Sequence, residues 1–226
     1  MTTRPVPAVS TGSEDDGPSA EPEPSPRRSR NGRGEGTRLR EEILTAAEEL
    51  LLTTGDSDAV SMRLVAEAVG VTPPAIYQHF PDKTTLIWEV SARYFAALDH
   101  SIDKAVVGVS DPIEELEVRG RAYVDFGRDN PEPYRVMFMM HPHAPADRFN
   151  EWVLQSRIFR EATANLQVCI DTGLFLPEYT DAFLVSLAYW ARIHGLTSLM
   201  ISKPALPWSD QFIDQYIHSC IHGIAR

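Results

Sequence analysis

The residues that could carry out catalysis or hold a metal ion are few in this chain of 226 residues. His141, His143 and Asp147 share a Pro-rich segment, but no further metal ligand follows at a useful spacing. Cys169 and Cys220 lie in hydrophobic helical patterns, and neither has an evident neighbouring base that would make its thiol a nucleophile. We therefore predict no catalytic residue, no cofactor and no metal site, while a metal ion as a bound ligand stays open as an alternative.

Polar side chains that could bind a partner gather in the segment 61–83, around a predicted turn between two short helices. Ser61 can cap the first helix, and Gly70 can take the left-handed conformation of a tight turn. Thr72 can cap the second helix, which Pro73 opens. This pattern is that of a helix-turn-helix, and the alternative is an ordinary helical hairpin. The apolar residues that can form the shared core are Leu64, Val65, Val69, Val71 and Ile76, with the small Ala66 where the helices cross.

Helical periodicity continues on both sides of this segment. Asp82 can cap a long helix that couples the motif to the rest of the chain. Asp111 and Asn130 can each cap a further helix that the proline after them opens. No run shows the sustained alternation of strands joined by hairpin turns. The predicted fold is all-α. Its roughly nine helices are expected at about 37–54, 62–69, from 73, 83–107, from 112, from 131, 147–171, 179–202 and 209–224.

The stretch from about 37 to 90 resembles the DNA-binding domain of the TetR family of transcriptional regulators. That domain ends in a Tyr-x-His-Phe element followed by an acidic or serine cap and a lysine, which here reads Tyr77-Gln78-His79-Phe80-Pro81-Asp82-Lys83. The resemblance implies a repressor that a small molecule releases from its operator. Two positions depart from the family pattern: Leu64 stands where many members have an acid that completes the cap, and Pro73 with Pro74 replaces residues that could donate hydrogen bonds.

The resemblance also implies which residues meet DNA. Thr72, Pro74, Ala75 and Gln78 would face the major groove, and Tyr77, His79 and Lys83 would contact phosphates. Gln78 is then the best base-reading side chain, with Thr72 next. Phe80 is expected to pack against the first helix instead. Arg63 could reach a phosphate or could be an ordinary solvated charge.

From about 111 onward the resemblance implies a helical domain for ligand binding and dimerisation. Asn130–Phe138 and Trp190-Ala-Arg-Ile-His194-Gly195 resemble a TetR subgroup with a Trp-x-x-x-His-Gly C-terminal domain. Its ligand is expected to be apolar or amphipathic and not a polyanion. The candidate pocket residues, each of which could instead be an ordinary core residue, are Arg93, Tyr123, Phe126, Met137, Phe138, His141, Trp152, Phe159, Tyr189 and His194.

The last two helices are apolar over more than one face, with Phe183, Leu187, Trp190 and His194 on the first and Phe212 and Tyr216 on the second. Burial within a monomer is possible, but a four-helix bundle with a second copy is favoured. Two helix-turn-helix segments that bind DNA one helical turn apart also require a dimer with two-fold symmetry.

The charge distribution bears on the DNA prediction. A net charge of −11 argues at first against nucleic acid, because a DNA-binding face must neutralise phosphates. Acidic residues gather at 14–23, however, and a basic run precedes the first helix. This run is expected to be an arm that enters a minor groove or tracks the backbone, or else a solubilising tail. Its members are Arg27, Arg28, Arg30, Arg33, Arg38 and Arg40.

The sequence thus predicts a disordered tail with a basic arm (1–36), a helix-turn-helix domain (37–83) and a ligand-binding and dimerisation domain (84–226). The expected partners are double-stranded operator DNA, a small-molecule effector and a second copy of the chain. With no long apolar run and no signal segment, no membrane partner is expected and the protein is placed in the cytoplasm. Two alternatives stay open: a metal- or ligand-binding helical protein without DNA binding, and an acidic helical interaction protein that has lost it.

Overall fold

The structure, a computed structural model, describes residues 35–139 and 154–225. Within these ranges the chain is helical and forms no β-strand, although an isolated bridge pairs Phe175 with Ala225. The predicted all-α fold is confirmed. The helices are α1 (Glu35–Thr54), α2 (Met62–Val69), α3 (Pro73–Tyr77), α4 (Lys83–Val106), α5 (Pro112–Asp129), α6 (Pro131–Phe138), α8 (Arg157–Asp171), α9 (Ala182–Ser202) and α10 (Asp210–His222).

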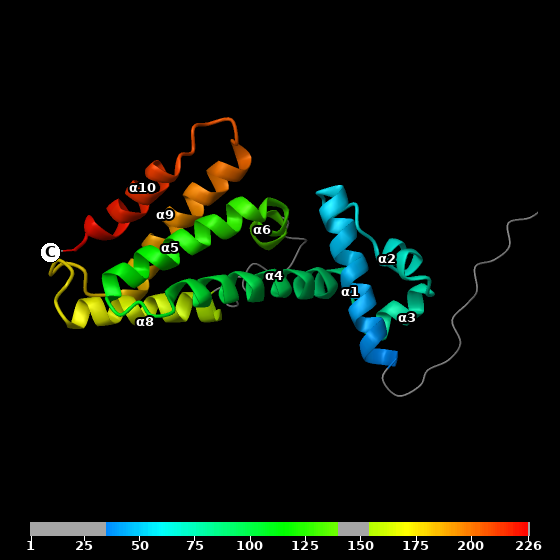
Figure 1. Ribbon diagram of the computed structural model, residues 1–226. Coiled ribbons are helices and arrows are strands. Elements are labelled where there is room, and N and C mark those ends of the chain that lie inside the picture. The colour runs from blue at the N-terminus through cyan, green and yellow to red at the C-terminus, as the bar shows by residue number, and fades with distance from the viewer. Residues whose placement is uncertain (1–34, 140–153, 226) are drawn as a thin grey trace, which may run out of the picture.

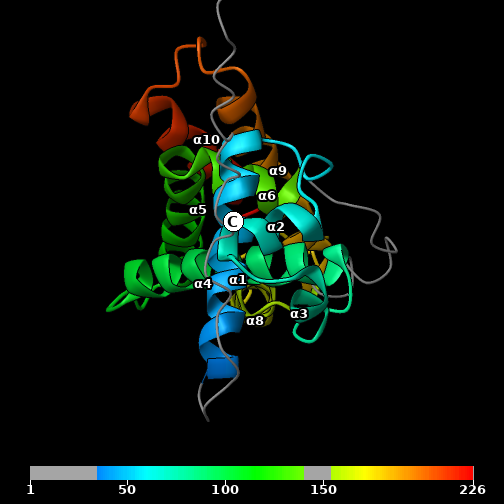
Figure 2. The same ribbon diagram turned by 90° about the vertical axis from the view of Figure 1, so that its right-hand side faces the viewer.

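The helices form a small head and a larger body joined by α4 (Figure 1). The head consists of α1, α2 and α3, with α1 crossing one end of α4. In the body, α5 packs against α4, α8, α9 and α10. Figure 2 looks at the molecule from the head and shows α2 and α3 beside the upright α1. No helix in the described part of the chain is long and apolar enough to cross a membrane.

Side-chain caps set several of the helix starts. Ser61 Oγ accepts a hydrogen bond from the Leu64 amide at 3.2 Å, and Asp82 Oδ1 accepts one from Thr85 at 2.7 Å. Asp111 Oδ1 likewise accepts from the amides at the start of α5. These three predicted caps are confirmed, and each satisfies amide groups that the first turn of a helix leaves unpaired.

Two predicted caps are wrong. Thr72 makes no side-chain cap, since α3 opens with two prolines that lack an amide hydrogen, and the Ala75 amide bonds to the Thr72 carbonyl at 2.9 Å instead. Asn130 makes no cap for α6 either, because its Nδ2 donates to the Phe126 carbonyl at 3.0 Å and so serves the end of α5. In both places a proline in the first turn favours the helix start.

The helix predicted at 147–171 is interrupted at Ser156, where the backbone bends and the side chain caps the Phe159 amide at 3.3 Å. Its first residues, 147–153, lie outside the described part. The helix predicted from about 179 begins at Ala182, because Asp181 caps it.

The head has its own apolar centre, and most of the predicted core residues lie in it. Val65 and Ile76 are buried, and Val69 and Val71 are partly buried against the same core. Leu64 is exposed, which corrects its predicted place in the core: the inward positions of α2 belong to Met62, Val65 and Ala66. The fully buried residues that join α1, α3 and the start of α4 are Ile43, Ala47, Leu51, Phe80 and Leu86.

Candidate nucleic-acid interface and ligand pocket

The turn between α2 and α3 holds the two helices at a fixed angle. Gly70 adopts a left-handed φ of 74°, which a side chain would strain, and its amide donates to the Glu67 carbonyl at 3.1 Å. The Val71 amide donates to the Ala66 carbonyl at 2.9 Å. This pair of bonds closes α2 and starts the chain toward α3, as the helix-turn-helix pattern predicts.

Helix α3 has one buried side and one exposed side. Ile76 and Phe80 are buried in the head, whereas Tyr77 is 52% exposed. The ring of Phe80 also lies under the Arg40 guanidinium of α1, 4.9 Å from its centroid, as expected for a residue that packs against the first helix. Of the residues predicted to face the major groove, Thr72, Pro74 and Gln78 are exposed and Ala75 is half-buried. His79, predicted to contact a phosphate, is half-buried as well.

The basic side chains of the head differ in whether they already have partners within the protein. Arg63 is exposed on α2. Lys83 donates to the Ser57 carbonyl at 2.9 Å and lies 3.7 Å from Asp58, so its ammonium group holds the loop between α1 and α2. An ammonium group has three donors, which leaves Lys83 able to contact a phosphate as well.

Two arginines of the predicted basic arm belong to the folded head instead. Arg38 pairs with Glu42 at 2.9 Å along α1, and Arg40 pairs with Glu89 of α4. The physical reason is that α1 begins at Glu35, so both side chains project from a helix packed on its neighbours. The other arginines of the run, Arg27, Arg28, Arg30 and Arg33, lie outside the described residues.

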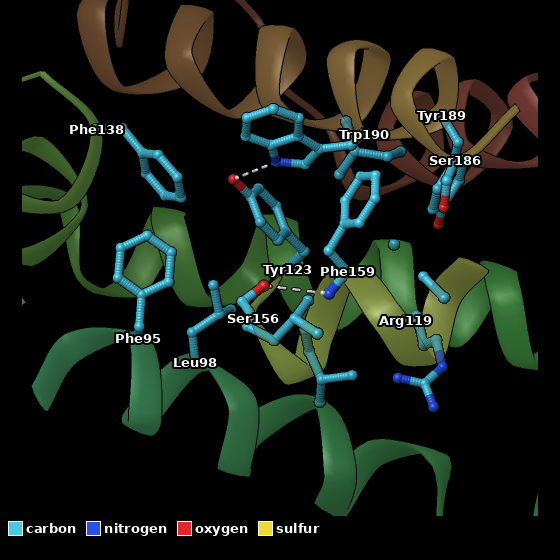
Figure 3. A pocket seen from close by; sticks show the side chains of 15 residues that line it. Phe95, Leu98, Arg119, Tyr123, Phe138, Ser156, Phe159, Ser186, Tyr189 and Trp190 are labelled. Carbon is cyan, nitrogen blue, oxygen red and sulfur yellow. Dashed lines mark hydrogen bonds between the residues drawn. The ribbon is translucent and has the colours of Figure 1, made fainter. Parts of the chain in front are cut away.

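The body contains a partly open cavity of about 60 Å³ between α4, α5, α6, α8 and α9 (Figure 3). Its wall is mostly aromatic and aliphatic, and Arg119 is the charged member of the lining. The lining residues are Phe95, Leu98, Ile102, Arg119, Gly120, Tyr123, Phe138, Ser156, Ile158, Phe159, Ala162, Ser186, Tyr189, Trp190 and Ile193.

The polar atoms of the lining are already hydrogen-bonded. Trp190 Nε1 donates to the Tyr123 hydroxyl at 3.4 Å (Figure 3). The Tyr189 hydroxyl donates to the Leu116 carbonyl at 2.6 Å. Arg119 donates to Glu115 at 2.7 Å and more weakly, at 3.3 Å, to Glu161. The 3.3 Å bonds from Arg119 to Glu161 and the 3.4 Å bond from Trp190 to Tyr123 are the longest of these, so they are the polar contacts that a ligand could most easily replace.

Four of the ten predicted pocket residues, Tyr123, Phe138, Phe159 and Tyr189, line the cavity. His141 and Trp152 lie outside the described residues. Phe126 and Met137 are buried core residues that do not line the cavity. His194 does not line it either, and its ring contacts the rings of Phe138 and Trp190. Arg93 forms ion pairs with Glu41 and Glu48 of α1.

His194 is half-buried in a polar cluster beside the cavity. Its Nδ1 lies 2.6 Å from the Tyr134 hydroxyl and 3.1 Å from that of Tyr123, and its Nε2 lies 3.4 Å from Ser198 Oγ. Burial lowers the pKa of His194, which favours the neutral imidazole. Burial also raises the pKa of Tyr134 to about 12. The cluster is therefore uncharged, in keeping with the apolar cavity next to it.

The two cysteines are poor nucleophiles. Both are buried, and burial raises the pKa of Cys169 to about 11 and that of Cys220 above its usual value. Their thiols therefore stay protonated near neutral pH.

The fold and these two regions define a class of protein: a helix-turn-helix head joined by one long helix to a helical body with an apolar cavity. Comparison with known families identifies the class. The N-terminal model of the bacterial regulatory proteins of the tetR family matches residues 43–90, and a tetracyclin repressor-like C-terminal domain matches residues 116–224. The chain belongs to the tetR family. The Trp-x-x-x-His-Gly subgroup stays a prediction.

The curated relatives include a transcriptional activator and a transcriptional repressor. The HTH-type transcriptional activator FasR of Mycolicibacterium smegmatis is 26% identical over 132 residues, which cover 58% of this chain and 55% of FasR. The HTH-type transcriptional repressor KstR of Mycobacterium tuberculosis is 25% identical over 160 residues, which cover 69% of this chain and 73% of KstR. The chain thus spans little more than half of FasR.

Solved structures share the fold at low sequence identity. A putative tetR family transcription regulator from Shewanella sp. PV-4 matches with a TM-score of 0.67 at 16% identity. The match covers 83% of this chain and 98% of the Shewanella chain. The fatty acid degradation regulator FadR from Bacillus halodurans has a TM-score of 0.67 at 15% identity, with coverage of 84% and 97%.

Proposed function

We propose that this protein is a sequence-specific DNA-binding transcriptional regulator that a small apolar or amphipathic ligand controls. The observation that carries the proposal is the two-sided α3: Ile76 and Phe80 anchor it in the head, and Tyr77 and Gln78 stand free on the other side. A short helix held in this way can enter the major groove. The division into a head (37–83) and a body (84–226) is part of the proposal.

Helix α4 is the proposed link between ligand and DNA. Its middle contributes Phe95, Leu98 and Ile102 to the cavity wall. Its first half is fixed to α1 by the Glu89–Arg40 pair and by Arg93, which lies 3.6 Å from Glu48. A ligand that displaces the middle of α4 therefore also moves the head, and DNA and ligand oppose each other.

The size of the cavity supports such a displacement. Pockets for small ligands enclose about 300–1,000 Å³, several times the 60 Å³ found here. We propose that ligand binding widens this cavity by moving its wall helices apart, and that this movement is the structural change behind the regulation.

The lining indicates the chemistry of the ligand. Aromatic and aliphatic side chains suit a hydrocarbon body, and Arg119 can bind an acidic or polar end in place of its 3.3 Å contact with Glu161. Two structural neighbours named for fatty acid regulation, FadR and a putative fatty acid metabolism regulator of Clostridium perfringens, support an amphipathic ligand of this kind.

We propose a homodimer through α9 and α10. Leu184 is 59% exposed on α9, and Phe183, Leu187 and Leu199 on the same helix and Phe212 on α10 are exposed as well. Burying these side chains in a four-helix bundle removes an apolar surface from water and pairs the two heads. Trp190 and His194 are not part of this face, because they lie on the cavity side of α9.

The repressor mode is the proposed one, and catalysis is not part of the function. Selecting genomic DNA fragments on the purified chain at moderate salt tests the proposal. We expect enrichment of fragments that share one palindromic sequence, and release of these fragments by the ligand. A chain that enriches no sequence would instead be a helical ligand-binding or interaction protein without DNA binding.

A further inference from the structure

We propose that Glu117 of α5 and His218 and His222 of α10 form a binding site for a divalent transition metal ion of the zinc type. Glu117 Oε1 lies 2.8 Å from His218 Nδ1 and 3.0 Å from His222 Nε2. One ligand atom from each of the three residues lies within 4.8 Å of the other two. Two imidazole nitrogens thus converge on one carboxylate oxygen.

The fold places these groups together for clear reasons. His218 and His222 are four residues apart on α10, which puts them on one face of the helix, and their rings stack with centroids 3.8 Å apart. Four residues along α5 from Glu117, Arg121 pairs with Asp210 at 2.6 Å and with Asp214 at 2.5 Å. These ion pairs fix the register of α10 on α5 and thereby bring the histidines to Glu117.

The groups around Glu117 differ chemically from those along the rest of the contact between α5 and α10. Elsewhere the α5–α10 edge joins arginine to aspartate, as in Arg121–Asp214 and Arg128–Asp210 at 2.9 Å. At Glu117 the facing groups are imidazoles, which are ligands for zinc, copper and nickel and are poorly suited to magnesium or calcium. Two histidines and one glutamate are a ligand set that zinc uses, with a fourth position left for water.

The side chains must move to bind an ion, because an imidazole holds a metal in its ring plane and the two rings are now stacked with their planes 20° apart. Zinc binds nitrogen and oxygen at about 2.0–2.2 Å, which places neighbouring ligands of a tetrahedral ion about 3.4 Å apart. The two nitrogens must therefore move from Glu117 Oε1 by a few tenths of an ångström. The side chains of His218 and His222 are 61% and 43% exposed, so they can rotate and an ion can reach them.

A bound ion would join two functional parts of the body. Helix α5 carries Arg119 and Tyr123 of the cavity, and α10 belongs to the proposed dimer face. The site would hold these helices together whether or not the protein binds DNA, so the inference stands apart from the proposed function.

Equilibrium dialysis of the full chain against Zn²⁺, after treatment with a chelator, tests the site. We expect about one ion per chain and a higher thermal unfolding midpoint with Zn²⁺. His218→Ala, His222→Ala and Glu117→Gln should each abolish this stoichiometric binding and the shift of the midpoint.

Two controls keep the result interpretable. His100→Ala removes an exposed histidine of α4 and should leave one ion bound. Replacing His141 and His143 with alanine tests the other histidine pair of the sequence and should also leave binding unchanged. Absence of saturable Zn²⁺ binding, or a His218→Ala/His222→Ala chain that binds as much Zn²⁺ as the unmodified chain, would overturn the proposal and leave the cluster as hydrogen bonds alone.

Discussion

At the scale of single residues, Tyr77 and Gln78 are adjacent and exposed but offer different groups to DNA. A phenol hydroxyl suits a phosphate oxygen, which every sequence presents. A carboxamide can bond two atoms of one base edge, which only some sequences present. The two side chains should therefore separate affinity from specificity.

Replacement of Tyr77 by Ala should lower affinity for the preferred and for random sequences by a similar factor, because phosphate contacts carry no sequence information. Replacement of Gln78 by Ala should cost about 1–3 kcal/mol on the preferred sequence and little on random DNA. Titration of both DNAs by fluorescence anisotropy measures the two effects, with Val107→Ala, at the far end of α4, as the control. Equal losses from both substitutions on both DNAs would contradict the assignment.

Gly120 shows how closely α5 approaches α9. A Cβ atom there would overlap the Tyr189 hydroxyl and would lie 3.2 Å from Ile217 Cγ2. Gly120→Ala should lower the free energy of unfolding by about 1–3 kcal/mol, because Tyr189 must leave its bond to the Leu116 carbonyl. Urea denaturation measures this, and Gly36→Ala, whose Cβ would meet no atom within 4 Å, is the matched control. A Gly120→Ala chain as stable as the control would show that α5 and α9 are not packed in this way.

His194 links stability to pH. Burial lowers its pKa below the usual 6.5, so below about pH 6.5 the unfolded chain protonates this imidazole before the folded chain does. Its contribution to stability is complete above pH 6.5 and is lost as the pH falls through the lowered pKa. His194→Gln should reduce the difference in unfolding free energy between about pH 7.5 and pH 5.5. His100→Gln, on the exposed side of α4, should not, and an unchanged difference in the His194→Gln chain would refute the assignment.

At the scale of elements, α4 and α8 enclose the cavity from different parts of the chain. Ala162 of α8 lines the cavity, and Ala164, two residues further on, is exposed. The two positions therefore allow the cavity to be filled or left open by the same substitution.

Ala162→Leu should fill the cavity, keep affinity for DNA and abolish release of DNA by the ligand. Ala164→Leu, the matched control, should leave release unchanged, since its side chain points to solvent. A DNA-release assay with a medium-chain fatty acid as the probe compares the two chains. If Ala162→Leu were released as readily as the unmodified chain, the cavity would not be the ligand site.

Much of the element structure follows from short-range chemistry that the sequence displays. Ser61, Gly70 and Asp82 act within a few residues of themselves, so their roles could be predicted. The roles of Thr72 and Asn130 could not be predicted correctly, because each depends on which neighbouring amide or carbonyl is available.

The cavity was predicted only in part for a related reason. Aromatic residues at helical spacing mark a core, but which of them border a cavity depends on how separate helices pack. Phe95 and Leu98 of α4 meet Phe159 of α8 through tertiary packing that no spacing in the sequence records. The cluster of Glu117, His218 and His222 was missed likewise, although the four-residue spacing of the two histidines on a predicted helix was a usable signal.

At the scale of the whole molecule, charge is the main constraint on DNA binding. Residues 35–90 contain four basic and ten acidic residues. Arg38, Arg40 and Lys83 also have partners within these residues. We therefore propose that the arginines before residue 35 supply part of the positive charge that DNA binding requires.

Replacing Arg27, Arg28, Arg30 and Arg33 together with glutamine should weaken binding to all DNA and make it less sensitive to salt. Each phosphate that an arginine no longer neutralises should reduce the slope of log affinity against log salt by about 0.9. Affinity measured at several salt concentrations gives the slope, and Arg4→Gln is the control outside the basic run. An unchanged slope would show that the segment is only a solubilising tail.

We expect two copies of this chain to place their α3 helices in successive major grooves of one DNA duplex. Footprinting of a selected fragment by the unmodified chain measures this arrangement. The protected sequence should be a palindrome whose half-site centres lie one helical turn, about 34–36 Å, or a whole number of turns apart. A Tyr77→Ala/Gln78→Ala chain should give no protection at the same concentration. Protection without two-fold symmetry, or equal protection by the doubly substituted chain, would show that the α3 helices do not bind DNA in this way.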